Sequence, residues 1–389
     1  MIDLPKKNLC LVSRSVYPNI FSDHTQNLRT FNEWRSFWDG ICVLSQTESK
    51  KSVFYNGENN INAVLLPRKR NQLKNLLYFF FFGIKEIYFL NRKYKFLAFQ
   101  ASDTPSAVVC YLARLVFGGK FIYEIQGDIF NLPSNIVGHI HSKTIKLLGK
   151  FFAIKADAVR VISPFILDNL VFFGVDKKKI YLVYPRCDDK IFNINAANRF
   201  KPKIFLENSK NIIYLGNLTT GKGVDVLIKA FALLSNETES IRLIICGEGE
   251  QKQYLTQLVT EMKLNNKIYF TGKIAYEHVP SYIYHSDILV LPSFHEGFGR
   301  VIIEAMALDT VVIASRVNGI KHLISDTNDG LLFEAGNEID LGDKIMKLIG
   351  SKSLYMKLKE NAQDKYTKFY SYKKSITDYI NMYKNIFYE

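Results

Sequence analysis

Short apolar runs alternate along the chain with longer stretches in which apolar residues recur every three or four positions. In the first half, runs rich in Val, Ile, Phe and Tyr predict strands at 8–13, 95–101, 120–126, 158–163 and 180–185. Between them, the helical period predicts helices at 105–117, 135–155 and 164–173. This alternation is typical of a mostly parallel sheet that helices cover on both faces.

The alternation pauses and then restarts more clearly. Residues 186–210 are polar and lack periodicity, and we expect 191–210 to be a linker. Further strands are predicted at 212–216, 242–247, 267–272, 287–293, 311–315 and 329–334, with helices between them and a helical stretch from 353 onward. The sequence therefore predicts two doubly wound α/β domains, at 1–190 and 211–370, separated by a cleft. We expect the C-terminal helix, 371–389, to pack back on the first domain.

Composition agrees with two folded cores, because 389 residues of which 48% are hydrophobic exceed the usual length of one domain. The net charge is +14, and it is uneven: residues 1–190 hold 27 Lys and Arg against 15 Asp and Glu. Such a basic half suggests an anionic partner, either a lipid headgroup layer or nucleic acid. The alternative is that the excess reflects general composition and no partner.

The compartment is predicted from cysteine usage and from the N-terminus. The five cysteines are scattered without a C-x-x-C spacing, which favours buried thiols in a reducing compartment. The first residues lack the layout of a signal peptide, so we expect a cytoplasmic protein. The longest apolar run, 76–84, is too short to span a bilayer.

The segment 67–96, PRKRNQLKNLLYFFFFGIKEIYFLNRKYKF, joins a basic cluster to an aromatic helix that has Lys and Arg at both ends. A helix that is cationic on one side and apolar on the other is suited to an anionic membrane interface. The alternative is a helix that packs on the sheet and uses the FFFF run as core.

The first candidate site is FHEGFGRVIIEAMA, residues 294–307, in which seven residues separate Glu296 from Glu304. It follows a predicted strand, and a helix is predicted to begin near Phe298 or Gly299. Glu296 would then stand beside the free N–H groups of a helix N-terminus, which suits a ligand with hydroxyls and phosphate. The alternative is a simple turn followed by a surface pair of Arg300 and Glu304.

Two further turns follow predicted strands of the same sheet. In YLGNLTTGKGVDVLIKAF, 214–231, Lys222 stands between glycines at the start of a helix, where it could hold a phosphate. In IICGEGEQ, 244–251, two glycines allow close approach, but the third glycine of a dinucleotide fingerprint is missing. Taken alone, Lys222 could equally be an exposed residue of a solvated turn.

Together these segments, followed by VVIASRVNGIKHLI and DGLLF, resemble the retaining GT-B glycosyltransferases of family 4, also called glycosyl transferases group 1. The resemblance is close over 211–350. It is looser in the first half, through KFIYEIQGD and VRVISPFILDNLVFFGVDKKKIYLVYPRCDDKIF. It implies the GT-B fold, with two doubly wound Rossmann-like domains facing across a cleft, an acceptor in the first and a nucleotide sugar in the second.

The resemblance also implies residue roles. Glu296 and Lys222 would be the catalytic residues, the first holding donor-sugar hydroxyls and the second neutralising the leaving diphosphate. Glu304 would bind the ribose. The donor-binding set would comprise Gly216, Asn217, Lys222, Gly247, Ile274, Glu296, Gly297, Phe298, Gly299, Arg300, Val301 and Glu304. Gln126 and Asp128 would lie on the acceptor side.

Some residues depart from the family pattern. Asn217 stands where relatives often carry Arg, so Arg300 or a base of the first half would supply the second cation. Gln126 replaces a common His, His322 replaces a common Glu, and the glycine pair expected after the first strand is absent. These departures bear on the choice of donor and on activity.

The predicted reaction moves a sugar from a nucleotide diphosphate donor to a hydroxyl of a saccharide, with retention implied by the resemblance. No Asp-x-Asp element occurs, so neither a metal nor another cofactor is expected. A lipid-diphosphate-linked acceptor would place the enzyme at the inner face of the membrane, in lipopolysaccharide, capsule or exopolysaccharide synthesis. The alternatives are a GT-B sugar-nucleotide epimerase, an inactive scaffold, and a basic nucleic-acid-binding α/β protein, although no RRM, KH or helix-turn-helix signature appears.

Overall fold

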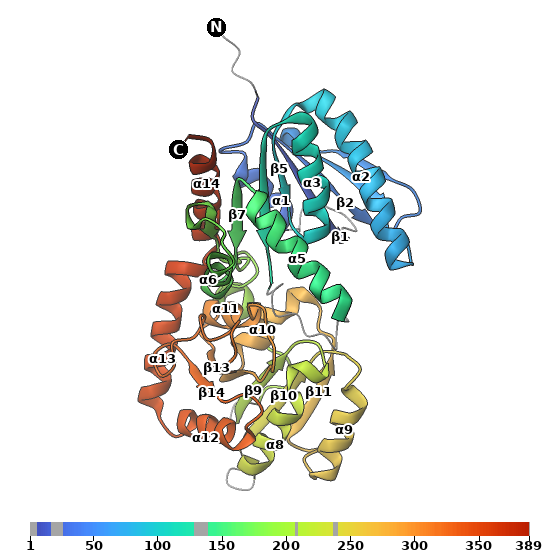
Figure 1. The fold of residues 1–389 in the computed structure, drawn as a ribbon. Coiled ribbons are helices and arrows are strands. Elements are labelled where there is room, and N and C mark those ends of the chain that lie inside the picture. Colours follow the sequence, from blue (N-terminus) through green and yellow to red (C-terminus); the bar gives the residue numbers. More distant parts are fainter. Residues whose placement is uncertain (1–5, 17–25, 128–138, 207–208, 236–239, 389) are drawn as a thin grey trace. The chain divides into compact units, whose positions relative to one another are not determined.

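The computed structural model describes residues 6–16, 26–127, 139–206, 209–235 and 240–388. The chain forms two compact units, one made of residues 1–184 together with 376–389 and the other of residues 185–375 (Figure 1). Each unit has its own sheet. The prediction of two doubly wound α/β units is confirmed.

The first unit is built on an eight-stranded sheet in the order β3-β4-β2-β1-β5-β6-β7-β8. Neighbouring strands are parallel except for the edge pair β3 and β4. The strands are β1 (Asn8–Val16), β2 (Gly40–Thr47), β3 (Val53–Asn56), β4 (Ile61–Pro67), β5 (Phe96–Ala101), β6 (Lys120–Ile125), β7 (Ala158–Val161) and β8 (Ile180–Leu182). The chain winds in one direction from β1 to β4 and in the other from β5 to β8, as in a doubly wound sheet.

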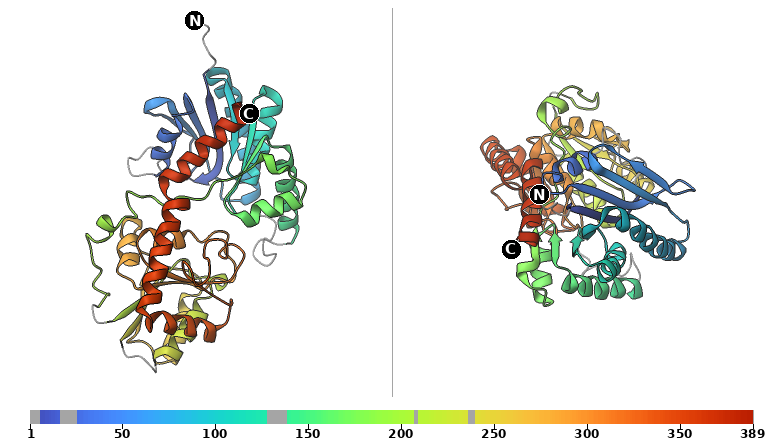
Figure 2. Two further views of the ribbon diagram at one scale, coloured as in Figure 1. Left: turned by 90° about the vertical axis from the view of Figure 1, so that its left-hand side faces the viewer. Right: turned by 90° about the horizontal axis from the view of Figure 1, so that it is seen from above.

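In the described part of residues 1–184, the α-helices are α1 (Gln26–Trp34), α2 (Gln72–Tyr94), α3 (Thr104–Phe117), α5 (His139–Lys155) and α6 (Pro164–Phe172). Since crossovers between parallel strands are right-handed, α2, α3 and α5 lie on one face of the sheet and α1 lies on the other. Figures 1 and 2 show α2, α3 and α5 side by side. Short polar side chains cap these helices, as when the Asp103 carboxylate accepts from the N–H of Ser106 at 2.8 Å.

The C-terminal helix α14 (Tyr372–Tyr388) completes the first unit from Ile376 onward. The hydroxyl of Tyr379 donates to Glu124 of β6 at 2.8 Å, and that of Tyr383 donates to Gln100 of β5 at 2.9 Å. All four side chains are buried. Two buried strand residues, which also bond each other, therefore accept hydrogen bonds from residues more than 250 positions further along the sequence.

The second unit has a six-stranded parallel sheet in the order β11-β10-β9-β12-β13-β14. Its strands are β9 (Lys210–Leu215), β10 (Ile241–Cys246), β11 (Ile268–Gly272), β12 (Ile288–Leu291), β13 (Val311–Ser315) and β14 (Leu331–Phe333). Its helices are α7 (Ile194–Ala197), α8 (Val224–Ser235), α9 (Lys252–Glu261), α10 (Val279–Tyr284), α11 (Arg300–Ala307), α12 (Glu338–Ile349) and α13 (Lys352–Lys365). The winding direction reverses between the adjacent strands β9 and β12.

The expected linker at 191–210 requires a correction, because the structure assigns this segment to the second unit. The segment contains α7, and three of its apolar side chains are buried: Phe192, Ala197 and Phe205. These apolar anchors stand singly among polar residues, so they create no periodic pattern. The predicted end of the first domain also needs correction: the first part of this unit ends at Tyr184 and not at residue 190.

The structure settles two simpler points. All five cysteines are free and buried, as expected. In the part of the chain that the structure describes, no helix is both long enough and apolar enough to cross a bilayer.

Candidate functional site

The candidate site lies where the winding direction of the second sheet reverses. The loop after β9 contains Lys222, in a turn of 3-10 helix at Thr220–Lys222, and the loop after β12 contains Glu296. In open α/β sheets, ligands bind at the carboxyl ends of the strands that flank such a reversal. The fold therefore brings these two loops together at the position where a ligand is expected.

Lys222 and Glu296 form a direct ion pair. The Nζ atom of Lys222 lies 2.6 Å from Oε2 of Glu296, and their side chains are 27% and 17% exposed. The N–H of Gly297 donates to the other carboxylate oxygen, Oε1, at 3.2 Å. An ammonium and a carboxylate at one partly exposed position can serve both an anionic group and hydroxyls of a ligand.

A close backbone contact fixes the Lys222 loop to the Glu296 loop. Gly223 has φ 62°, and a Cβ atom at this position would lie 2.2 Å from the carbonyl oxygen of Pro292. The N–H of Phe294 donates to the carbonyl of Gly221 at 3.0 Å. Only glycine fits this approach, so the G-K-G sequence around Lys222 has a structural reason.

The Gly-Glu-Gly turn after β10 packs equally closely against the turn after β9. A Cβ atom on Gly247 would lie 1.8 Å from the carbonyl oxygen of Gly216, and one on Gly249 would lie 2.3 Å from that of Leu218. The N–H of Leu218 also donates to the carbonyl of Glu248 at 3.0 Å, and the carbonyl of Leu218 accepts from the N–H of Gln251 at 2.9 Å. The main chain thus forms a continuous rim along the sheet edge.

Helix α11 begins at Arg300, four residues after Glu296. Gly299 precedes it with φ 76° and provides no side-chain cap. The N–H of Ile302 donates to the carbonyl of Gly299 at 2.9 Å, and the N–H groups of Arg300 and Val301, at the first two positions, have no acceptor within the helix. The buried side chains of Phe298, Ile302 and Met306 anchor the helix to the sheet. Its positive dipole end therefore lies beside the ion pair, in a position that favours a bound anion.

Glu304 lies one helical turn after Arg300 in α11 and is half-buried. It is therefore not an exposed partner of Arg300 in a surface pair. Burial raises the pKa of its carboxyl group, and the charge of Arg300 acts in the opposite direction. Burial also raises the pKa of Tyr276 to about 12, and the nearby charge of Glu304 contributes to this shift. Glu304 and Tyr276 therefore belong to one partly buried environment.

A third loop supports Glu296 from the side of β13; its segment is part of the family resemblance, but the sequence analysis did not single out Gly319. A Cβ atom on Gly319 would lie 1.8 Å from the carbonyl oxygen of Glu296. The available signal was a glycine in VNGIK, just after a predicted strand. Gly319 sets the distance between the two loops and leaves no room for a side chain.

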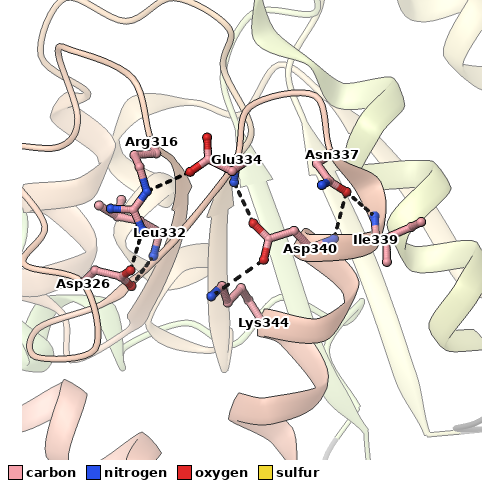
Figure 3. A network of polar contacts seen from close by, with 8 residues as sticks. All are labelled: Arg316, Asp326, Leu332, Glu334, Asn337, Ile339, Asp340 and Lys344. Atoms are coloured by element: carbon pink, nitrogen blue, oxygen red, sulfur yellow. Dashed lines mark hydrogen bonds and ion pairs between the residues drawn. The ribbon is translucent and has the colours of Figure 1, made fainter.

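A network of polar contacts fixes the ends of the segment that contains Gly319 (Figure 3). The guanidinium of Arg316 donates to Asp326 at 2.5 Å and to Glu334 at 3.0 Å. Asp326 also accepts from the N–H of Leu332 at 2.9 Å, and Asp340 accepts from the N–H of Glu334 at 2.7 Å. These contacts tie the loop to β14 and to the start of α12.

The other predicted donor residues lie at the same edge of the second sheet. Gly216 and Asn217 are exposed after β9, Ile274 is half-buried after β11, and Val301 is half-buried in α11. Gln126 belongs to the first unit, where it is exposed and donates to Glu124 at 3.0 Å. The remaining acceptor-side residue, Asp128, lies outside the described residues.

Among the residues that the structure describes, no group of three or more His, Cys, Asp or Glu side chains could hold a metal ion. The expectation that the reaction needs neither a metal nor another cofactor stays a prediction.

Comparison with known proteins assigns the family. The model of glycosyl transferases group 1 matches residues 196–365. The chain is 30% identical over 286 residues to an uncharacterized glycosyltransferase of Methanocaldococcus jannaschii, covering 70% of each chain. It is 28% identical over 258 residues to the N-acetylgalactosamine-N,N'-diacetylbacillosaminyl-diphospho-undecaprenol 4-alpha-N-acetylgalactosaminyltransferase of Campylobacter jejuni, covering 66% of this chain and 67% of that one.

The fold is also found among solved structures. The structure of Anabaena HepE in complex with UDP-glucose aligns with a TM-score of 0.73 at 17% identity, over 97% of this chain and 99% of that one. At this identity the likeness concerns the fold. Together with the sequence relatives it leads to one conclusion: the chain belongs to the glycosyl transferases group 1 family and is a glycosyltransferase of the GT-B type.

Proposed function

We propose that this glycosyltransferase moves a hexosyl-type sugar from a nucleotide diphosphate donor to a hydroxyl of a saccharide acceptor, with retention at the anomeric carbon. The observation that carries the proposal is the ion pair of Lys222 and Glu296 at the reversal point of the second sheet. Its two charges match the two parts of such a donor, an anionic diphosphate and a sugar with several hydroxyls.

The difficult step is departure of the diphosphate, which gains negative charge as the glycosidic bond breaks. In the proposed mechanism, the ammonium of Lys222 and the N-terminus of α11 stabilise that charge, because both are fixed before the reaction begins. Glu296 accepts hydrogen bonds from donor hydroxyls, and Glu304 accepts from the ribose. Structural support for such a donor comes from HepE, whose structure holds UDP-glucose.

We further propose that the acceptor saccharide is linked to a lipid diphosphate. The Campylobacter relative, by its name, acts on a diphospho-undecaprenol-linked sugar. Helix α2 supports the same proposal, because it carries exposed aromatic residues together with basic ones. Such an enzyme would work at the inner face of the membrane in the synthesis of lipopolysaccharide, capsule or exopolysaccharide.

A two-stage experiment tests the proposal. A panel of nucleotide diphosphate sugars is first screened by thermal shift, since a ligand that binds only the folded state raises its stability. The stabilising donors are then incubated with and without undecaprenyl-diphosphate-linked saccharides, and products are separated by chromatography. We expect nucleotide diphosphate to appear only when an acceptor is present. Formation of an isomeric nucleotide sugar without an acceptor would indicate an epimerase instead.

A further inference from the structure

The outer surface of α2, α3 and α5 is unusually apolar for exposed helices. These three helices pack in sequence on one face of the first unit's sheet, α2 against α3 and α3 against α5 (Figure 1). We call their outer surface the three-helix face. Its exposed apolar side chains are Leu73, Leu77, Phe81, Phe82, Tyr88 and Phe89 of α2, Leu112, Leu115 and Val116 of α3, and Leu147, Leu148, Phe151 and Ile154 of α5.

The most exposed of these residues are too open to solvent to be partly covered core residues. Phe81 is 74% exposed although Phe79, two positions earlier, is fully buried. Val116 of α3 and Leu147 of α5 are each 70% exposed. Many exposed apolar side chains gathered on adjoining helices favour an interaction site in soluble proteins. The FFFF run therefore supplies both core and surface.

The same three helices carry a strong positive charge. Across 72–94, 104–117 and 139–155 there are nine Lys and Arg residues and one acidic residue, Glu86. The bases are spread over the helices, as Lys74, Lys85, Arg92 and Lys93 of α2, Arg114 of α3, and Lys143, Lys146, Lys150 and Lys155 of α5. The basic excess of the first half of the sequence is thus concentrated on these helices.

Several Lys and Arg side chains make cation–π contacts with aromatic rings of α2. The Nζ atom of Lys69, just before α2, is 4.4 Å from the ring centre of Tyr78, and that of Lys85 is 5.9 Å from the ring of Phe82. The guanidinium of Arg92 is 5.9 Å from the ring of Tyr88. In this arrangement, apolar side chains can enter a bilayer while long basic side chains keep their charges at the headgroup level.

We propose that the whole three-helix face, and not α2 alone, lies on an anionic lipid bilayer. The inference rests on the proposed function in one respect, since a lipid-linked acceptor requires the enzyme to reach a membrane. The charge excludes a second copy of the chain as the natural occupant, because two such faces would repel each other. Nucleic acid would neutralise the bases but would leave the thirteen exposed apolar side chains in water.

Helix α5 provides the decisive test, because an α2-only contact does not involve it. The full chain is mixed with vesicles of phosphatidylcholine with or without phosphatidylglycerol, and binding is measured by co-sedimentation. Two variants are compared with the wild type: Leu147→Ser with Phe151→Ser, and Lys146→Glu with Lys150→Glu. A matched control, Leu233→Ser with Tyr254→Ser, changes residues of α8 and α9 that are 49% and 48% exposed.

We expect the wild type to bind only vesicles that contain the anionic lipid. Each α5 variant should lose at least about tenfold in partitioning to these vesicles, because one loses the attraction of lysines to the headgroups and the other loses apolar area buried in the bilayer. The control should bind as the wild type does. Full binding by both α5 variants would overturn the proposal, as would a wild type that prefers duplex DNA to the vesicles. Circular dichroism and thermal melting of each variant identify any loss that comes from unfolding.

The outcome is separable from that of the proposed function. If the α5 variants leave the vesicles but still bind the donor and transfer sugar to a short water-soluble acceptor, the face is a membrane surface and the chemistry is intact. If the wild type binds vesicles but transfers no sugar, the proposed reaction is wrong and the three-helix face stands.

Discussion

The ammonium of Lys222 lies 2.6 Å from the carboxylate of Glu296 although 74 positions separate the two residues in the sequence. The contact exists because β9 and β12, which precede them, are neighbours in the sheet. Before a donor binds, each charge is satisfied by the other. A donor must therefore compete with this ion pair, and the two residues should respond to mutation as a unit.

Lys222→Ala is expected to lower the turnover number by about 10²–10³, because it removes the cation that faces the leaving diphosphate. Affinity for UDP, measured by calorimetry, should fall as well. Lys229→Ala is the matched control, since Lys229 of α8 is 38% exposed and forms an ion pair with Asp225 at 3.5 Å, away from Glu296. Equal activities of the two variants would argue against a role for Lys222.

Glu296→Gln should also lower turnover by at least about 10², since the amide keeps the shape but not the charge. It should not weaken UDP binding, because Lys222 is released from its ion pair with Glu296. The double variant should lose less than the two single losses combined, as expected for groups that act together. Strictly additive losses in a kinetic cycle would contradict the coupling.

Gly319→Ala is expected to destabilise the second unit by about 1–3 kcal/mol, because the added methyl group would overlap the carbonyl oxygen of Glu296. Donor affinity should fall with it, since the Glu296 loop must move. Gly342→Ala in α12 is the control. A Cβ atom there would lie 3.8 Å from its nearest neighbour, so we expect the free energy of unfolding to rise by about 0.5–1 kcal/mol. Urea unfolding measures both, and equal effects would refute the contact.

Stability should depend on pH through Glu304, because burial raises the pKa of this carboxyl group in the folded protein. The folded state then binds more protons than the unfolded state between the ordinary and the raised pKa, so stability falls as pH rises through that window. Above it, Glu304→Gln should be more stable than the wild type, and the difference should shrink on acidification. Urea unfolding at several pH values gives this difference directly, and a constant difference would exclude the effect.

Most of the second unit could be predicted from the sequence, since its six strands are short apolar runs bounded by glycine-rich turns. Three strands of the first unit were missed: β2, β3 and β4. β2 is buried along its whole length, yet it ends in Ser45, Gln46 and Thr47, which interrupt the apolar signal. The Gln46 amide is satisfied by Asn75 of α2 at 2.9 Å, a partner that no local pattern reveals.

The candidate site shows the same division. Lys222 and Glu296 were identified because glycine turns follow their strands, whereas Gly319 was not. Gly319 matters because it closely approaches the carbonyl oxygen of Glu296 in a different loop. The distance between the two loops is set by the packing of the sheet and cannot be predicted from either segment alone. The pairing of Glu124 with Tyr379 likewise joins residues 255 positions apart and has no sequence signature.

That last pairing has a consequence for biosynthesis. During translation, residues 185–375 leave the ribosome as one continuous segment and can close their sheet early. The first unit is completed only after that segment has been made, because the hydroxyls that donate to Glu124 and Gln100 belong to Tyr379 and Tyr383, which follow it in the chain. The first unit is thus begun before the second unit is made and completed only after it.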